Sequence, residues 1–156
     1  MNFGICDIRK HEDKTPSRYV EIFFNNNLKE EVVLIGHSKD GNDILGVTKD
    51  DINPIKHEYL LWIYACYSAN GLCSHLSKKG YITIGFEKKA ITYKNSNPSE
   101  IEYIEKSTVT YRSMNQKDIE KDLKLKMYHC AKEQFQQKKY LLGIIINYNR
   151  LILKVT

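Results

Sequence analysis

The chain has 156 residues, of which 42% are hydrophobic and 28% charged, and its formal net charge at neutral pH is +5. This length suits a single domain over residues 1–156, and the composition excludes a disordered chain. No apolar run approaches the roughly 18 residues that a membrane-spanning helix needs, which excludes a membrane-spanning chain. Lysines are interspersed with acidic residues, which weakens any long-range field, so we expect no nucleic-acid partner.

The N-terminal part predicts two buried strands with a helix between them. Residues 2–8 form a short apolar-rich stretch, as in a buried strand, and a polar loop comes next. Thr15 and Pro16 have the character of a helix start, and we expect a short helix over residues 17–26. The apolar run at 32–35 does not alternate with polar residues, which indicates a strand covered on both faces.

The middle of the chain predicts two further core strands around a short helix. The strands are residues 58–66 and 81–86, both of them nearly continuous apolar runs. Residues 70–80 between them fit a short helix that ends in glycine. Shorter strand pieces are expected at Ile44–Thr48 and over residues 90–93.

The C-terminal part predicts a long helix and a terminal strand. The polar residues 94–116 are expected to form loop and irregular helix. Residues 118–140 place apolar side chains three and four positions apart, the pattern of a helix with one buried face. Residues 141–155 are rich in leucine and isoleucine, and we expect a strand or hairpin there. The alternation of strands and helices favours an α/β fold, a three-layer sandwich with a mostly parallel central sheet.

Two reactive side chains come directly after two of the predicted core strands. His37 succeeds the run VVLIG, and Cys66 succeeds the run LLWIYA. If these strands are parallel neighbours, both side chains emerge at the same edge of the sheet, where sites in such sheets gather. The connection between them is long enough for the crossover that parallel neighbours need. We therefore expect His37 and Cys66 to meet.

A thiol beside an imidazole is the chemistry of a cysteine nucleophile. Free cysteine is mostly protonated at neutral pH, and an imidazole can take the proton or stabilise the thiolate. The backbone N–H groups of Ser38 and Cys66 could hold a carbonyl oxyanion, and the helix expected near Asn70 could favour the thiolate. The plainer interpretation is that Cys66 is only a core residue, since free cysteine is among the most buried residue types.

The stretches VVLIGHS and LLWIYACYSANGLCSHLSKKGYITIGF resemble the caspase-like cysteine peptidases of the caspase, gingipain, clostripain and separase clan, and bacterial CHAT-type proteins in particular. In that clan a histidine ends one core strand, usually as His-Gly. The nucleophile ends the next strand within the pattern Ala-Cys-x-Ser/Thr-Gly/Ala. A helix comes next, and then a strand that ends like IGF. The resemblance covers about residues 31–93.

The resemblance implies a caspase-like fold and a cysteine endopeptidase that needs no cofactor. His37 would be the base and Cys66 the nucleophile of a dyad that cleaves protein substrates through a thioester acyl-enzyme. Ser38 stands where the family normally has a glycine, whose N–H helps to form the oxyanion hole. Bacterial relatives often serve in defence or regulated cell death, and activation by a partner or by self-association stays open.

The side chain recognised before the cleaved bond also stays open. Relatives bind aspartate through basic pockets, and arginine or lysine through acidic ones. Several arginine-specific relatives place an aspartate two residues before the cysteine, where this chain has Tyr64. Asp7 could line an acidic pocket, and Arg9 or Arg18 could line a basic one.

Other interpretations compete with the peptidase. The main alternative is a caspase-like fold used as a binding or scaffolding module. Ser38 resembles the nucleophile of a serine hydrolase, but Asp40 stands where that motif needs glycine. The four cysteines match no common zinc spacing, so we expect no metal. We expect no signal peptide, so the cysteines should be free thiols in a reducing cytoplasm. We expect His57, His75 and His129 to be non-catalytic.

Overall fold

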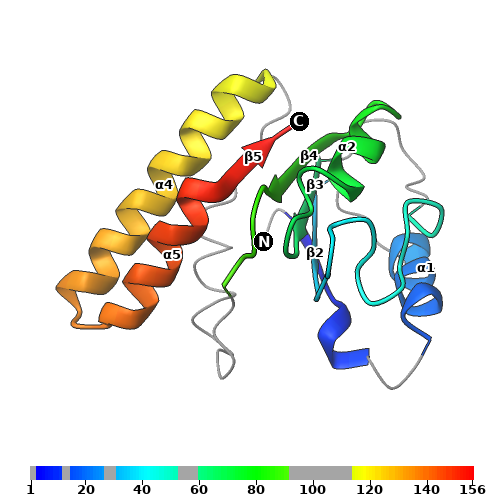
Figure 1. The fold of residues 1–156 in the computed structure, drawn as a ribbon, viewed down its shortest axis with the longest axis horizontal. Helices are drawn as coiled ribbons and strands as arrows, with labels where there is room; N and C mark the ends of the chain where they lie inside the picture. The colour runs from blue at the N-terminus through cyan, green and yellow to red at the C-terminus, as the bar shows by residue number, and fades with distance from the viewer. Residues whose placement is uncertain (1–2, 12–14, 27–30, 53–59, 92–113) are drawn as a thin grey trace.

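A computed structural model describes residues 3–11, 15–26, 31–52, 60–91 and 114–156. These residues contain a five-stranded sheet whose strands lie in chain order, from β1 to β5 (Figure 1). The first four strands are parallel and β5 is antiparallel to β4, which confirms an α/β fold with a mostly parallel sheet. The strands are β1 Phe3–Asp7, β2 Glu31–Ile35, β3 Leu60–Tyr64, β4 Ile82–Phe86 and β5 Leu153–Val155.

One face of the sheet is covered by the connections between the parallel strands. Helix α1, Pro16–Asn26, and helix α2, Leu72–Ser77, pack there together with residues 44–52. Crossovers between parallel neighbours are right-handed as a rule, so connections that advance in one direction across a sheet fall on the same face. The strand order therefore explains why all three connections lie on this side.

The opposite face is covered by a C-terminal helical hairpin. Helix α4, Gln116–Gln136, and helix α5, Tyr140–Ile152, lie side by side against the sheet (Figure 1). Their apolar faces enclose a core in which Trp62, Tyr64 and Phe86 are fully buried. The chain thus forms three layers, with a hydrophobic core on each side of the sheet, as the sequence predicts.

The strand or hairpin expected over residues 141–155 is wrong for most of its length, because α5 continues to Ile152 and only Leu153–Val155 are strand. The leucine and isoleucine run has high β propensity, which tertiary packing overrides. The buried positions of α5 recur at helical spacing, and Gly143 lets α4 approach: a Cβ there would lie 2.9 Å from the Phe135 ring. The buried positions are Leu142, Gly143, Ile145, Ile146, Asn149 and Ile152.

Smaller differences concern the ends and the short elements. The helix expected over 118–140 is confirmed as α4, which begins two residues earlier and ends at Gln136, because the chain turns there and α5 begins at Tyr140. The strand expected at Ile44–Thr48 is instead a tight turn closed by one bridge between Ile44 and Val47. The loop expected after the first strand begins with a short 3-10 helix, Ile8–His11. The predictions for residues 94–113 and for His57 lie outside the described residues.

Ala90 and Ile91, part of another expected strand piece, are not in a strand; residues 92–93 lie outside the described part. Among the described helices, none is long and apolar enough to cross a membrane.

Candidate active site

The carboxyl ends of β2 and β3 lie level with each other. Ile35, the last residue of β2, pairs with Tyr64, the last residue of β3. Beyond this pair, the N–H of Gly36 donates a hydrogen bond to the carbonyl of Tyr64 at 3.3 Å. The register therefore brings the residues after both strands to one edge of the sheet.

Gly36 makes the exit from β2 possible. A Cβ atom at this position would lie 2.1 Å from Cγ2 of Ile44, so any larger residue would displace the turn that packs there. The next residue, His37, has an exposed side chain, and its carbonyl accepts a hydrogen bond from Leu45 N at 3.0 Å. The loop after β2 therefore holds the His37 backbone while its imidazole faces the surface.

Cys66 leaves β3 in a comparable way. Ala65 is buried, whereas Cys66 is half-buried, and its Sγ donates to the carbonyl of Ala90 at 3.5 Å. The residues after Cys66 are tied to the end of β4: Tyr67 N donates to Lys88 at 3.0 Å, and Ala69 N donates to Phe86 at 3.1 Å. The thiol is thus held between the ends of β3 and β4.

The hydroxyl of Ser68 links the two strands beneath this loop. It donates to the carbonyl of Ile63 at 2.9 Å and accepts from the N–H of Phe86 at 3.2 Å. Gly85 leaves room for it, because a Cβ on Gly85 would lie 2.7 Å from Ser68 Oγ. Ser68 is 1% exposed, so its role is to position the loop and not to react.

Two glycines hold the loop of His37 against the loop of Cys66. A Cβ on Gly41 would lie 2.1 Å from the carbonyl oxygen of Tyr67, and a Cβ on Gly71 would lie 2.2 Å from the carbonyl oxygen of Gly41. The first N–H of α2, that of Leu72, donates to the same Gly41 oxygen at 2.6 Å. The two loops can pack this closely only because neither position carries a side chain.

This contact corrects one expectation. The helix after Cys66 begins at Leu72, two residues later than expected, and its first N–H is bonded to Gly41. The N-terminus of α2 therefore faces the loop of His37, and the expected help of this helix for a Cys66 thiolate has no support.

His37 and Cys66 line the same pocket at this edge of the sheet. The pocket has a volume of about 410 Å³. Its described walls come from the residues after β2, the residues after β3 and the segment after β4. The lining residues are Gly36, His37, Ala65, Cys66, Lys89, Ala90 and Ile91. The fold thus brings together the thiol and the imidazole that the sequence pattern indicates.

The backbone beside these two side chains offers hydrogen-bond donors. Among the described residues, neither the N–H of Ser38 nor the N–H of Cys66 has a protein acceptor. The Ser38 hydroxyl accepts from the N–H of Gly41 at 2.8 Å, so this side chain is engaged within its own loop. The Ser38 side chain is therefore accommodated by a local turn.

The residues considered for substrate recognition lie elsewhere. Tyr64 is fully buried, and its ring contacts that of Phe86 with 4.9 Å between centroids, so the core encloses it. Asp7 is buried and paired with Arg9, whose Nε and Nη2 each donate to its carboxylate at 2.9 Å. None of Asp7, Arg9 and Tyr64 lines the pocket. A direct substrate contact by Tyr64 or Asp7 is not supported.

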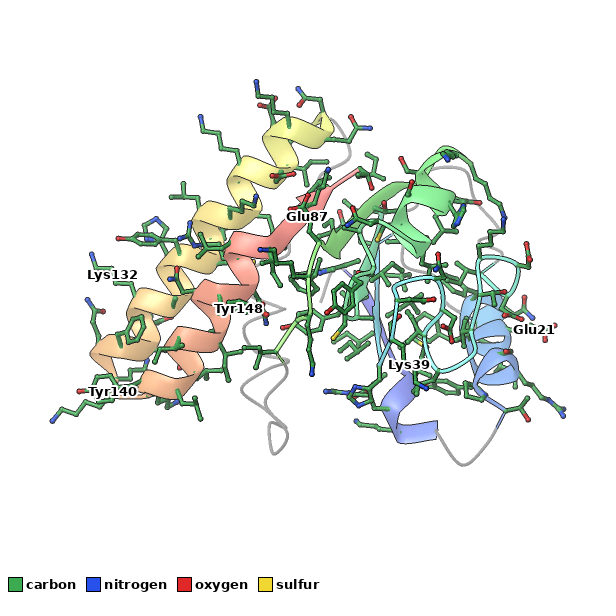
Figure 2. All side chains as sticks on the ribbon, viewed as in Figure 1. Glu21, Lys39, Glu87, Lys132, Tyr140 and Tyr148 are labelled. Atoms are coloured by element: carbon green, nitrogen blue, oxygen red, sulfur yellow. The ribbon has the colours of Figure 1, made fainter. Side chains whose placement is uncertain are left out.

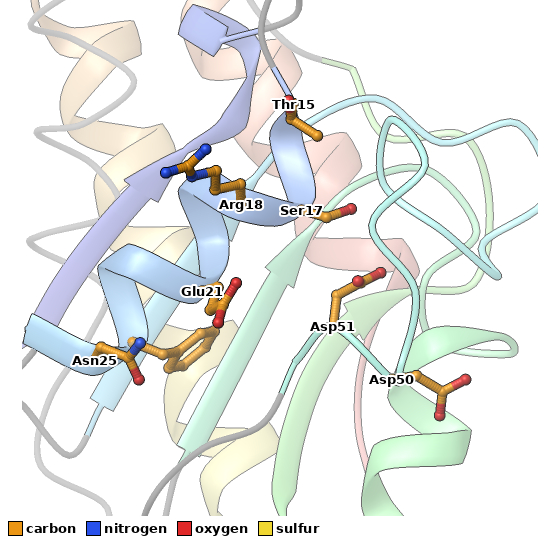
Figure 3. A pocket seen from close by; sticks show the side chains of 8 residues that line it. Thr15, Ser17, Arg18, Glu21, Asn25, Asp50 and Asp51 are labelled. Atoms are coloured by element: carbon orange, nitrogen blue, oxygen red, sulfur yellow. The ribbon is translucent and has the colours of Figure 1, made fainter.

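Arg18 lies on α1 and lines a second hollow, of about 540 Å³ (Figure 3). Figure 3 shows Arg18 and Glu21 on the helix, with Asp50 and Asp51 on the loop across from them. Asp51 already accepts hydrogen bonds from the N–H and hydroxyl of Thr48, at 2.8 and 3.1 Å. The described lining contains no cysteine or histidine, so it offers neither a thiol nor an imidazole.

Two residues of α5 that sequence reasoning missed hold the segment after β4 in place. The side chain of Asn149 is fully buried, accepts from Ile91 N at 3.0 Å, and donates to Ile91 O and to the Tyr64 hydroxyl, both at 2.8 Å. The hydroxyl of Tyr148 donates to Lys89 O at 3.1 Å. The available signal was the polar run NYNR at residues 147–150 within an otherwise apolar stretch, and it does not single out Asn149.

The other cysteines are structural. Cys6, Cys73 and Cys130 are all buried. Burial raises the pKa of Cys73 to about 12, against the opposing effect of hydrogen bonds with Thr83 and Ser68. Burial, aided by the charge of Asp7, likewise raises the pKa of the Cys6 thiol to about 12. Within the described residues, no three cysteine, histidine or acidic side chains lie close enough together to hold a metal ion.

Comparisons with known proteins identify no relative of this chain. The chain matches no protein-family model, no curated protein and no solved structure. The chemistry of the site therefore has to be inferred from its own geometry.

Proposed function

We propose that the protein is a cysteine endopeptidase of the caspase-like type, with Cys66 as nucleophile and His37 as base. The observation that carries the proposal is that these two side chains, far apart in the sequence, line one pocket at the carboxyl edge of neighbouring parallel strands. Cys66 is also the one half-buried thiol, whereas the other three are buried. A nucleophile must be reachable, and a base must share its pocket.

The proposed reaction proceeds in two steps. His37 accepts the proton of the Cys66 thiol, and the sulfur attacks the carbonyl carbon of a peptide bond. The tetrahedral intermediate collapses to a thioester as His37 gives its proton to the departing amine. Water, deprotonated by His37, then attacks the thioester, which releases the acid product and returns the proton to the thiol. No cofactor enters either step.

The oxyanion of each intermediate needs donors that carry no other hydrogen bond. The backbone N–H groups of Ser38 and Cys66 meet this condition among the described residues, and they flank the dyad. Such preorganised donors are commonly the largest single contribution to acyl transfer. The turn that draws the Ser38 hydroxyl toward Gly41 supports this assignment, because it leaves the hydroxyl engaged within the loop.

The order of elements supports the caspase-like assignment. Histidine comes after β2, cysteine comes after the neighbouring β3, α2 is next, and β4 ends in Ile84-Gly85-Phe86. This is the order that the resemblance implies, and Gly85 has a structural reason in the packing of Ser68 against β4. A role in bacterial defence or regulated cell death rests on the resemblance alone and is part of the proposal.

Active-site labelling tests the dyad directly. Wild-type protein and the variants Cys66→Ala and His37→Ala are incubated with a peptidyl acyloxymethyl ketone and analysed by intact mass. We expect one adduct on wild type, none on Cys66→Ala and strongly slowed labelling of His37→Ala. Cys130→Ala and His75→Ala are matched controls and should label like wild type. A folded wild-type protein that labels no faster than His37→Ala would exclude the dyad.

A binding or scaffolding module is the alternative, and the outer face of α5 favours it. Tyr140, Leu141, Ile144 and Leu151 are each 57–63% exposed. Figure 2 shows Tyr140 and, on α4, Lys132 on the side of the hairpin away from the sheet. A helix that is apolar on both faces normally has a partner. Absence of His37-dependent labelling, together with self-association that Ile144→Asp abolishes, would favour this alternative.

A further inference from the structure

We propose that residues 89–91 form the specificity wall of the pocket and that Lys89 selects an acidic side chain next to the cleaved bond. This inference rests on the proposed function and adds the substrate class. It is carried by three observations: how the wall is held, which charges the pocket contains, and which nearby charges are already neutralised.

Hydrogen bonds hold the wall and the residue before it, Lys88. Each backbone carbonyl from 88 to 91 accepts one, two of them from the loop after β3 and two from α5. The donors are Tyr67 N to Lys88 at 3.0 Å, Tyr148 Oη to Lys89 at 3.1 Å, Cys66 Sγ to Ala90 at 3.5 Å and Asn149 Nδ2 to Ile91 at 2.8 Å. A segment outside any strand that is anchored in this way is a preorganised surface, as a recognition wall must be.

The wall is also connected to the nucleophile itself. The Ala90 carbonyl contacts the Cys66 thiol, so a side chain that rests against residues 89–91 lies beside the reacting sulfur. The side chain immediately before the cleaved carbonyl is the part of a substrate that has to lie there. Residues 89–91 are thus placed to choose that side chain.

The described lining of the pocket is positively charged. Lys89 is its one lysine, His37 is the other basic residue, and none of the described lining residues is acidic. The Lys89 side chain is exposed, and its ammonium has no carboxylate partner among the described residues. A carboxylate that enters the pocket therefore meets an ammonium group that no described acid neutralises.

Two acidic residues at strand ends are already paired. Asp7, the last residue of β1, is bound by Arg9, and Glu87, the residue after β4, lies 3.4 Å from Lys154 of β5. Neither of these carboxylates lines the pocket, so neither offers a site for a lysine or arginine of the substrate. The charge arrangement favours aspartate or glutamate over a basic residue.

A series of acyloxymethyl ketones that differ only in the terminal residue tests the inference. Terminal Asp, Asn, Leu and Lys are compared by the second-order rate of Cys66 labelling. We expect Asp to react about tenfold faster than its neutral isostere Asn, the effect of one charge-assisted hydrogen bond in a partly solvated pocket. Lys89→Ala should abolish this preference, and Lys89→Glu should reverse it in favour of the Lys probe.

Lys88→Glu is the matched control, since Lys88 carries the same charge one residue away and does not line the pocket. It should keep the preference for Asp within about twofold, because exposed charges at a distance are screened. His37-dependent labelling without a preference for Asp, or equal effects of Lys88→Glu and Lys89→Glu, would overturn the inference and leave the dyad standing. If no probe gives His37-dependent labelling, both proposals fail together.

Discussion

The carbonyl oxygen of Gly41 occupies the space that a side chain at Gly71 would need. A Cβ on Gly71 would lie 2.2 Å from this oxygen, and the neighbouring N–H of Leu72 donates to it at 2.6 Å. Gly41 belongs to the loop that carries His37, and Gly71 to the loop that carries Cys66. The spacing of imidazole and thiol therefore depends on a backbone contact that no side chain interrupts.

Gly71→Ala should push the two loops apart. We expect a loss of about 2 kcal/mol in the free energy of unfolding, the usual range for overpacking, measured by urea denaturation. The rate of Cys66 labelling should fall further than the loss of folded protein explains. Gly46→Ala is the control for steric contact: nothing lies within 4 Å of its Cβ, although its φ of +84°, unlike the φ of −107° at Gly71, itself disfavours alanine. If Cys66 is labelled as fast in Gly71→Ala as in wild type, the contact does not determine how His37 and Cys66 are spaced.

Asn149→Ala should destabilise the protein and loosen the pocket wall. The substitution removes three hydrogen bonds of a fully buried side chain and leaves the N–H and carbonyl of Ile91 without their partner. We expect a loss of about 3 kcal/mol in the free energy of unfolding. The control is Asn147→Ala on the same helix. Its half-buried amide accepts from Arg150 Nε and has no other side-chain partner among the described residues, so a loss of about 0.5 kcal/mol is expected. Similar losses for the two variants would contradict the assigned role.

The four thiols should differ sharply in reactivity. Cys66 is half-buried, while Cys6 and Cys73 are fully buried and have pKa values raised to about 12 by burial. Because the thiolate is the reactive form, brief treatment with iodoacetamide at pH 8 should modify the native protein once, at Cys66. In urea all four cysteines should react. Mass spectrometry of digested protein would locate the adducts, and fast modification of Cys73 would contradict this burial.

The same raised pKa values predict a loss of stability at alkaline pH. The unfolded chain releases the protons of Cys6 and Cys73 near pH 9, whereas the folded protein holds them to about pH 12. Between these values the unfolded state binds fewer protons, so the free energy of unfolding falls as pH rises, by at most about 1.4 kcal/mol per pH unit for each thiol. Below pH 9 these two thiols should not make the free energy of unfolding depend on pH.

Urea titrations from pH 8 to 11 measure this slope. The variant Cys6→Ala/Cys73→Ala should be less stable at neutral pH, because it loses buried groups, but its stability should fall less steeply above pH 9. An unchanged slope in this variant would assign the alkaline loss to other groups, such as the tyrosines.

The β-rich parts of the fold were predictable because their apolar runs are local. Strands β1 to β4 coincide with runs that need cover on both faces, and α1, α2 and α4 show helical spacing or helix-start residues. Residues 141–155 were not predictable in this way. Their β-branched run favours a strand, and α5 forms because α4 and the sheet offer a face for its buried positions.

At the candidate site, the sequence by itself indicated which groups would carry the proposed chemistry. A histidine and a cysteine directly after apolar runs indicate a base and a thiol at strand ends, because neighbouring parallel strands end at one edge of the sheet. The tertiary structure alone decided that β2 and β3 are neighbours in level register, that glycines lock the two loops, and that Asn149 and Tyr148 of α5 hold the wall bearing Lys89. It also placed Tyr64 in the core and paired Asp7 with Arg9. These relationships join residues far apart in the chain, so packing and long-range hydrogen bonds create them and no local pattern encodes them.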